Sequence, residues 1–132
     1  MSIDALCRKW QKLLRLQDWD ITARIFEDKE YESLEIGTDL KAGETMAVNA
    51  IDAFRKHSAI YMKKTNAELE LYLLHELCHI LIAPLDDLGV PVLAYISSLD
   101  ARQHMTLAWT DALEESVWNM ARALYSIHRA QK

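Results

Sequence analysis

The stretch from Asn66 to Ala83 constrains the fold of this chain more than any other. It is apolar on nearly every side of a helix, and it contains no glycine or proline before Pro84. A helix that is apolar all round is a buried helix. The stretch therefore predicts a buried helix with Asn66 as its N-cap, ended by Pro84.

Within this helix, the sequence His75-Glu76-Leu77-Cys78-His79 places two histidines four residues apart. Residues at this spacing share one helix face, so both imidazoles can bind the same metal ion. Glu76 follows the first histidine and is near enough to act as a general base on a water bound to that metal. Two imidazole ligands and a base on one rigid helix are typical of a zinc hydrolase. The alternative is a core helix whose two histidines and glutamate are satisfied without a metal.

Length, charge and cysteine content restrict the remaining possibilities. A chain of 132 residues, 51% of them hydrophobic, is long enough for one domain with a real core, so residues 1–132 are expected to form a single domain. The net charge of −5 makes direct nucleic-acid binding a poor expectation. No apolar run approaches the length of a membrane span. Cys7 and Cys78 lie far apart and suggest no disulfide framework, which favours a cytoplasmic location.

Apolar periodicity predicts the other elements of secondary structure. Before the helix that carries the two histidines, we expect a helix at Ile3–Leu16 and a strand at Trp19–Glu27. An acidic loop at Asp28–Glu44, with room for one short strand near Leu34–Ile36, comes next, and an antiparallel hairpin of Thr45–Asp52 and Ser58–Lys64 follows it. After Pro84, we expect a turn at Asp86–Pro91 and a short helix that begins at Ser97 or Ser98 and ends at Trp109. A long amphipathic helix is expected at Asp111–His128. The predicted fold is α+β. In it, a small antiparallel or mixed sheet of three to four strands packs against the N-terminal helix, the histidine helix and the C-terminal helix.

A catalytic zinc ion usually has three protein ligands, so one more is needed. Asp86 lies seven residues after His79 (86 − 79), but Pro84 intervenes and the spacing matches no common pattern of zinc ligands. Glu114 and Glu115 lie on the predicted C-terminal helix, and either carboxylate can supply the ligand. His104 is a further candidate, 25 residues after His79 (104 − 79).

The pair Glu115 and Asn119, one helical turn apart, resembles the glutamate helix of gluzincin metallopeptidases, in particular the small ImmA/IrrE-like members, many of which are phage- or prophage-borne. The resemblance implies a zincin-like fold and a zinc-dependent peptidase with peptide or protein substrates. It implies that Glu115 is the third ligand and that Asn119 orients a ligating imidazole. His104 and Tyr95 are candidates to stabilise the oxyanion.

Two other interpretations stay open. A His at position 104 is similar to the third ligand of SprT-like proteases, although Met105 stands where those have glycine. A zinc-stabilised binding or regulatory module that does not cleave is a different class of function, but Glu76 argues against it, because a structural site needs a fourth ligand rather than a base. The weakly apolar strand Thr45–Asp52 is also a candidate edge strand that pairs with an extended peptide.

Overall fold

The computed structural model of the protein describes residues 2–33, 45–51, 56–64 and 68–131. The chain divides into two compact units, Met1–Ile80 and Leu81–Lys132, and each is described by itself. The α+β class predicted from the sequence is confirmed. The expectation of a single domain stays a prediction. In the described ranges, no helix combines the length and the apolar character needed to cross a membrane.

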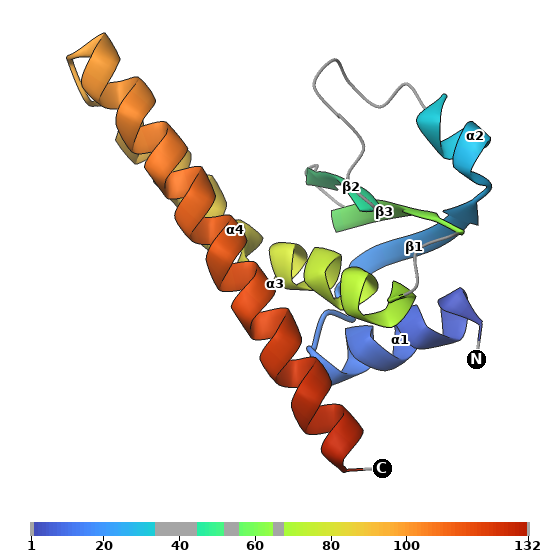
Figure 1. Cartoon of the computed structure of the whole chain (residues 1–132). Helices are drawn as coiled ribbons and strands as arrows, with labels where there is room; N and C mark the ends of the chain where they lie inside the picture. Colours follow the sequence, from blue (N-terminus) through green and yellow to red (C-terminus); the bar gives the residue numbers. More distant parts are fainter. Residues whose placement is uncertain (1, 34–44, 52–55, 65–67, 132) are drawn as a thin grey trace. The chain divides into compact units, whose positions relative to one another are not determined.

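The first unit contains a three-stranded sheet in the order β1-β3-β2 (Figure 1). Strands β2 (Thr45–Ile51) and β3 (Lys56–Lys63) pair antiparallel, so the predicted hairpin is confirmed. Strand β1 (Trp19–Phe26) pairs with β3 in parallel, with Ala23 opposite Ile60. Among the residues that the structure describes, β3 is the central strand, and β1 and β2 are the two edges of the sheet.

One face of the sheet is covered by α1 (Ile3–Leu13) and by the first part of α3 (Leu69–Leu93) (Figure 1). Helix α1 begins at Ser2, whose hydroxyl accepts a hydrogen bond from the Ala5 N–H at 3.2 Å. The core combines alternate residues of β1 and β3 with the buried faces of the two helices: Ala23, Ile60, Met62, Cys7, Trp10, Leu73, Leu74 and Leu77. The histidine motif therefore lies on a helix that is held in this core.

A short helix, α2 (Asp28–Glu32), occupies the start of the segment that was predicted as a loop, so that prediction is wrong for these residues. Its Tyr31 is only 1% exposed, and the Lys63 ammonium lies 5.4 Å from the centre of the Tyr31 ring. Burial of one aromatic side chain thus stabilises a helix too short to show apolar periodicity. The short strand expected near residues 34–36 lies outside the described residues.

Helix α3 runs through Pro84 and Pro91 to Leu93, so the predicted end at Pro84 and the predicted turn at Asp86–Pro91 are wrong. Proline inside a helix removes one hydrogen bond and costs about 3 kcal/mol. Packing of the residues beyond it opposes that cost, because Gly89 lies directly against the Trp109 indole in the second unit. The predicted N-cap, Asn66, lies outside the described residues.

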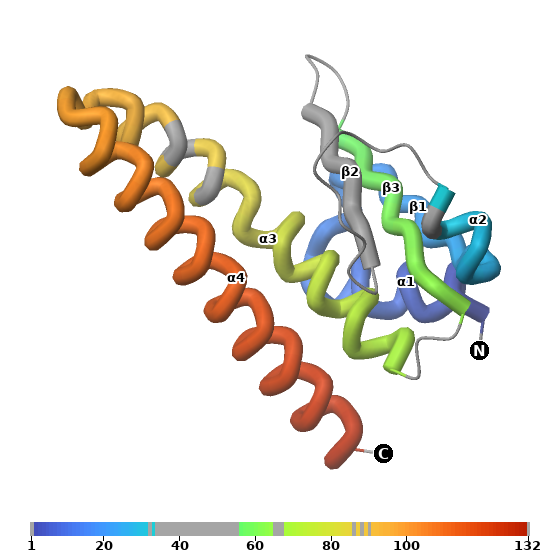
Figure 2. Tube along the Cα trace, turned by 45° about the horizontal axis from the view of Figure 1, so that its top comes forward, coloured from blue at the N-terminus to red at the C-terminus, as the bar shows by residue number. Residues whose placement is uncertain are grey.

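In the second unit, the last part of α3 and the first part of α4 (Leu99–Ala130) form a helical hairpin, and both views show the chain turning back on itself (Figures 1 and 2). The connection is fixed by Arg102, whose Nε and Nη2 donate to the Ile96 carbonyl at 3.0 and 2.9 Å. Ser98 caps α4 by accepting from the Ala101 N–H at 3.3 Å.

Helix α4 is continuous, so the prediction of two separate helices meeting near Thr110 is wrong. The hydroxyls of Thr106 and Thr110 donate to the carbonyls of Arg102 and Thr106 one turn earlier, at 2.7 and 2.9 Å. Threonine often ends helices because its hydroxyl competes for backbone groups. Here both hydroxyls are bonded within the helix, and the helix continues through them.

Candidate metal centre

The two histidines of the motif lie on one face of α3, as their spacing predicted. Their Nε2 atoms are 3.0 Å apart, and their ring centres are 4.8 Å apart. His75 is 4% exposed and His79 is half-buried. Both rings therefore direct a nitrogen at the same point, which lies at the border of the core.

This arrangement fits a bound zinc ion. Two nitrogens, each about 2.05 Å from a tetrahedral zinc ion, lie about 3.3 Å apart, close to the separation seen here. A single proton shared between neutral imidazoles also accounts for a separation of 3.0 Å. Metal analysis distinguishes these two cases, because only the first retains zinc.

Glu76 is the buried carboxylate of the motif, and it is 9% exposed. It directly follows His75, so the helix rotation of about 100° per residue places its side chain beside the histidine face. A carboxylate held away from bulk water beside two imidazoles is the chemical requirement for a general base at a metal-bound water.

Cys78 is the other potential metal ligand of the motif. Burial raises the pKa of its thiol from 9.0 to about 11. The thiol is therefore protonated at neutral pH, and a protonated thiol is a poor metal ligand. Of the side chains in this motif, the two imidazoles are therefore better suited than the thiol to bind a metal ion.

The first turn of α3 is tied to α1 by Glu70, a residue outside the histidine motif. Glu70 Oε1 accepts hydrogen bonds from Trp10 Nε1 at 2.8 Å and from Lys9 Nζ at 2.7 Å. The acceptor lies five residues before His75 and fixes how α3 lies on α1. The sequence does not single out Glu70, because Glu68 and Glu76 are acidic residues of the same stretch.

The remaining candidates belong to the second unit. Val117 and Ala121 form the buried stripe of α4, and Trp118 is half-buried. Glu114 precedes these residues by three, seven and four positions, the spacing of residues that share one face. Glu115 falls a further 100° round the helix, on the exposed side.

Asn119 shares that exposed side with Glu115, one turn later, so the two lie one above the other, as the sequence suggests. His104 is exposed on the first part of α4, and Tyr95 is 90% exposed in the turn after α3. The roles of these residues in metal binding or catalysis stay predictions.

Comparisons of the chain with protein-family models, with curated proteins and with solved structures found no match. Function is therefore inferred from the chemistry of the residues.

Proposed function

We propose that the chain is a zinc-dependent peptidase with a zincin-like site. The observation that carries the proposal is the pair of Nε2 atoms, 3.0 Å apart on a buried helix, with the buried Glu76 beside them. Polar groups lose hydration when they are buried, and coordination to a metal ion offsets part of that loss. A metal ion with a bound water would engage both imidazoles and the carboxylate.

A carboxylate of α4 is proposed as the third ligand. We favour Glu114, because it shares a face of α4 with the buried Val117 and Ala121, three and seven positions later, whereas Glu115 lies about 100° further round the helix. In the gluzincin-type alternative, Glu115 ligates the metal and Asn119 supports an imidazole. In the SprT-like alternative, the ligand is His104.

His75, His79 and the α4 ligand would hold the zinc ion, which supplies Lewis-acid polarisation of the scissile carbonyl and a lowered pKa for a bound water. Glu76 accepts the proton of the attacking water and delivers it to the nitrogen of the leaving amine. A carboxylate can perform both transfers because it is regenerated in its ionised form at the end of the cycle.

An extended peptide is the proposed substrate. Strand β2 is an edge of the sheet, so one side of its main chain has no strand beside it in the described sheet. Edge strands bind extended peptides by main-chain hydrogen bonds. Such pairing along β2 would hold a substrate without requiring a particular side-chain sequence.

Zinc content of the purified chain is the first test. We expect close to one equivalent, and less than about half an equivalent after mild purification contradicts the proposal. The Glu76→Gln variant keeps the ligands and the size of the side chain, so it should retain zinc and lose hydrolysis of a casein substrate. Retained hydrolysis contradicts the role of Glu76, and full zinc without hydrolysis in the wild type favours a non-catalytic zinc module.

The third ligand is tested by matched amide or neutral replacements. Glu114→Gln is expected to lower zinc affinity by at least about tenfold, the effect of losing a ligand or its support, while Glu115→Gln and His104→Gln leave it unchanged. Loss of zinc in Glu115→Gln alone supports the gluzincin-type alternative, and loss in His104→Gln alone supports the SprT-like one.

A further inference from the structure

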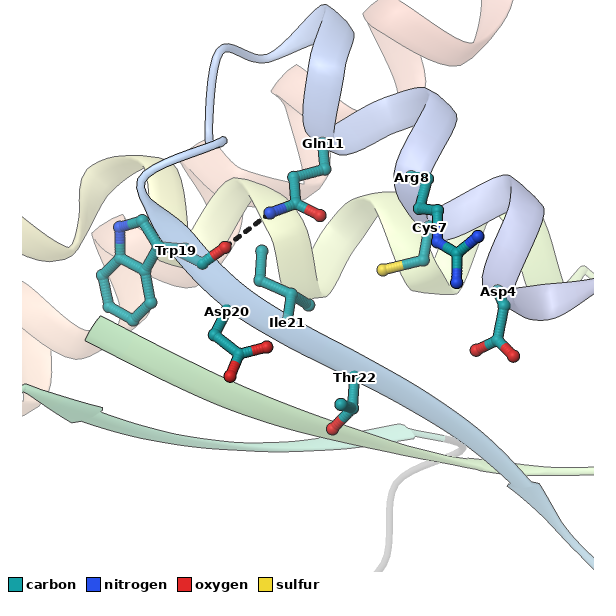
Figure 3. Close-up of a pocket in the computed structure, with 8 residues that line it drawn as sticks. All are labelled: Asp4, Cys7, Arg8, Gln11, Trp19, Asp20, Ile21 and Thr22. Atoms are coloured by element: carbon teal, nitrogen blue, oxygen red, sulfur yellow. Dashed lines mark hydrogen bonds between the residues drawn. The ribbon is translucent and has the colours of Figure 1, made fainter. Parts of the chain in front are cut away.

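A cavity lies in the first unit, between α1 and the start of β1, and none of the residues that line it belongs to the histidine motif. Its volume is about 360 Å³. It is lined by residues of α1 and by the first residues of β1 (Figure 3). A cavity of this size accommodates a small ligand or two to three residues of a peptide.

Strand β1 presents main-chain groups to this cavity because it is an edge of the sheet. The Trp19 N–H donates to the Leu16 carbonyl at 3.0 Å, and the Trp19 carbonyl accepts from Gln11 Nε2 at 2.6 Å. Both groups of Trp19 therefore point away from β3. Since the N–H and C=O of alternate residues in a strand point to the same edge, those of Ile21 are directed to the free edge as well.

The part of the cavity wall formed by Cys7 and Ile21 is uncharged, whereas Asp20, Asp4 and Arg8 also line the cavity. Ile21 directs its side chain toward α1, whereas Asp20 and Thr22 extend on the opposite side of the strand (Figure 3). Cys7 is 3% exposed, and its thiol is protonated at neutral pH because burial raises its pKa to about 11. The sulfur and the isoleucine side chain together suit an apolar group of the size of valine.

The α1 side of the cavity carries Asp4 and Arg8, one turn apart and of opposite charge (Figure 3). Opposite charges at this spacing largely cancel toward a ligand. An uncharged ligand therefore fits this cavity better than a strongly charged one.

We propose that this cavity binds an uncharged extended peptide segment, which pairs with the main chain of Ile21 and places one valine-sized side chain against Cys7 and Ile21. Gln11 covers the edge at Trp19 by bonding its carbonyl, so the added strand must be short. The same contact opposes pairing with a second copy of β1 along the whole length of the strand, because Trp19 is then already bonded. A short peptide segment is thus favoured over self-association.

This peptide site is independent of the proposed peptidase centre, so the two can be tested separately. The probe is the peptide acetyl-Thr-Val-Thr-Val-Thr-amide, titrated into ¹⁵N-labelled full-length Glu76→Gln protein, with mass spectrometry to verify that the peptide stays intact. We expect saturable shifts of the Ile21 amide resonance with a Kd on the order of 0.1–1 mM, as for a few main-chain bonds. The same peptide with N-methyl groups on its two valines, and in a second version on its three threonines, provides the backbone control.

Two variants separate binding from folding. Ile21→Pro removes the Ile21 N–H, which points away from β3, so no hydrogen bond to β3 is lost and the variant should fold. It should bind the probe at least about tenfold more weakly than the parent. Ile21→Val keeps the donor and should bind within about twofold of the parent, since only one methylene is lost. In these proline and valine variants, binding is followed by the shifts of residues 20 and 22.

Four outcomes overturn the proposal. They are the absence of saturable shifts at residues 20–22, unchanged binding by both N-methylated peptides, unchanged binding in Ile21→Pro, and shifts of the Ile21 amide that depend on protein concentration without peptide. The last of these would assign the edge to a second copy of the chain.

Discussion

A methyl group added at Gly89 gives a sharp test of the helical hairpin in the second unit. A Cβ atom at this position would lie 2.5 Å from Cε2 and 2.8 Å from Cη2 of Trp109, and closer still to Cζ2. Contacts under 3.0 Å essentially never occur between a real Cβ and another heavy atom, so the indole must move. The Gly89 backbone is helical and otherwise suits alanine.

Two opposed effects set the size of the change in Gly89→Ala. Replacing a helical glycine by alanine stabilises a helix by about 1 kcal/mol. Displacing a packed ring costs about 1–3 kcal/mol. We expect a net decrease of about 1 kcal/mol in the free energy of unfolding, because the indole is rigid and the overlap involves several of its atoms.

The double-mutant cycle with Trp109→Leu makes the prediction specific, because leucine has no ring at the position of the overlap. In that background, Gly89→Ala should raise the free energy of unfolding by about 0.5–1 kcal/mol, so its effect changes sign. Urea unfolding followed by circular dichroism at 222 nm measures all four proteins. Ala108→Gly, at an exposed position of α4, calibrates the intrinsic glycine penalty. An increase in stability in the wild-type background would refute the packing of Gly89 against Trp109.

Three further predictions concern the first unit and the metal. Glu70→Ala should lower the free energy of unfolding by about 1–3 kcal/mol, because Trp10 and Lys9 lose their acceptor, and Glu70→Gln should cost less; equal losses in urea unfolding contradict this. Burial raises the pKa of the Cys7 and Cys78 thiols from 9.0 to about 11, so their contribution to stability is complete below pH 9 and is lost as pH rises through 11. Urea unfolding should show this loss, and Cys7→Ala should reduce it. Zinc at 100 times its Kd should raise the free energy of unfolding by about 2.7 kcal/mol over the chelated protein, and thermal unfolding with and without EDTA measures it.

The elements that were predicted correctly are those with strong local periodicity. Helix α1, strand β1 and the hairpin of β2 and β3 each show a repeat that matches their secondary structure. The parallel pairing of β1 with β3 was left open by the sequence, because both strands alternate in the same way whichever direction their neighbour runs. Contacts between distant segments decide such pairings.

The errors lie where a specific contact in the structure outweighs a residue that usually marks a helix end or start. Pro84 is a strong local signal to end a helix, but packing beyond it, at Gly89 against Trp109, offsets its cost. Thr110 followed by Asp111 resembles a helix start, yet the Thr110 hydroxyl bonds back into α4. In the first case the deciding contact is between two helices, and in the second it is a hydrogen bond to the preceding turn of the same helix.

The two histidines could be placed from the sequence alone, whereas the choice of the third ligand could not. His75 and His79 belong to one helix, so their spacing alone implies that both rings meet, as the contact of 3.0 Å shows. Glu114 and Glu115 are neighbours, and choosing between them requires the rotational phase of α4. The apolar residues of the sequence place Ile127 on the buried stripe, but Ile127 is 57% exposed, whereas Trp118 and Tyr125 are half-buried. The buried stripe is therefore rotated toward Trp118, and this rotation brings Glu114, rather than Glu115, to its border. A shift of less than one residue in phase thus decides which carboxylate we propose as the ligand, and zinc affinity in the two glutamine variants measures that phase directly.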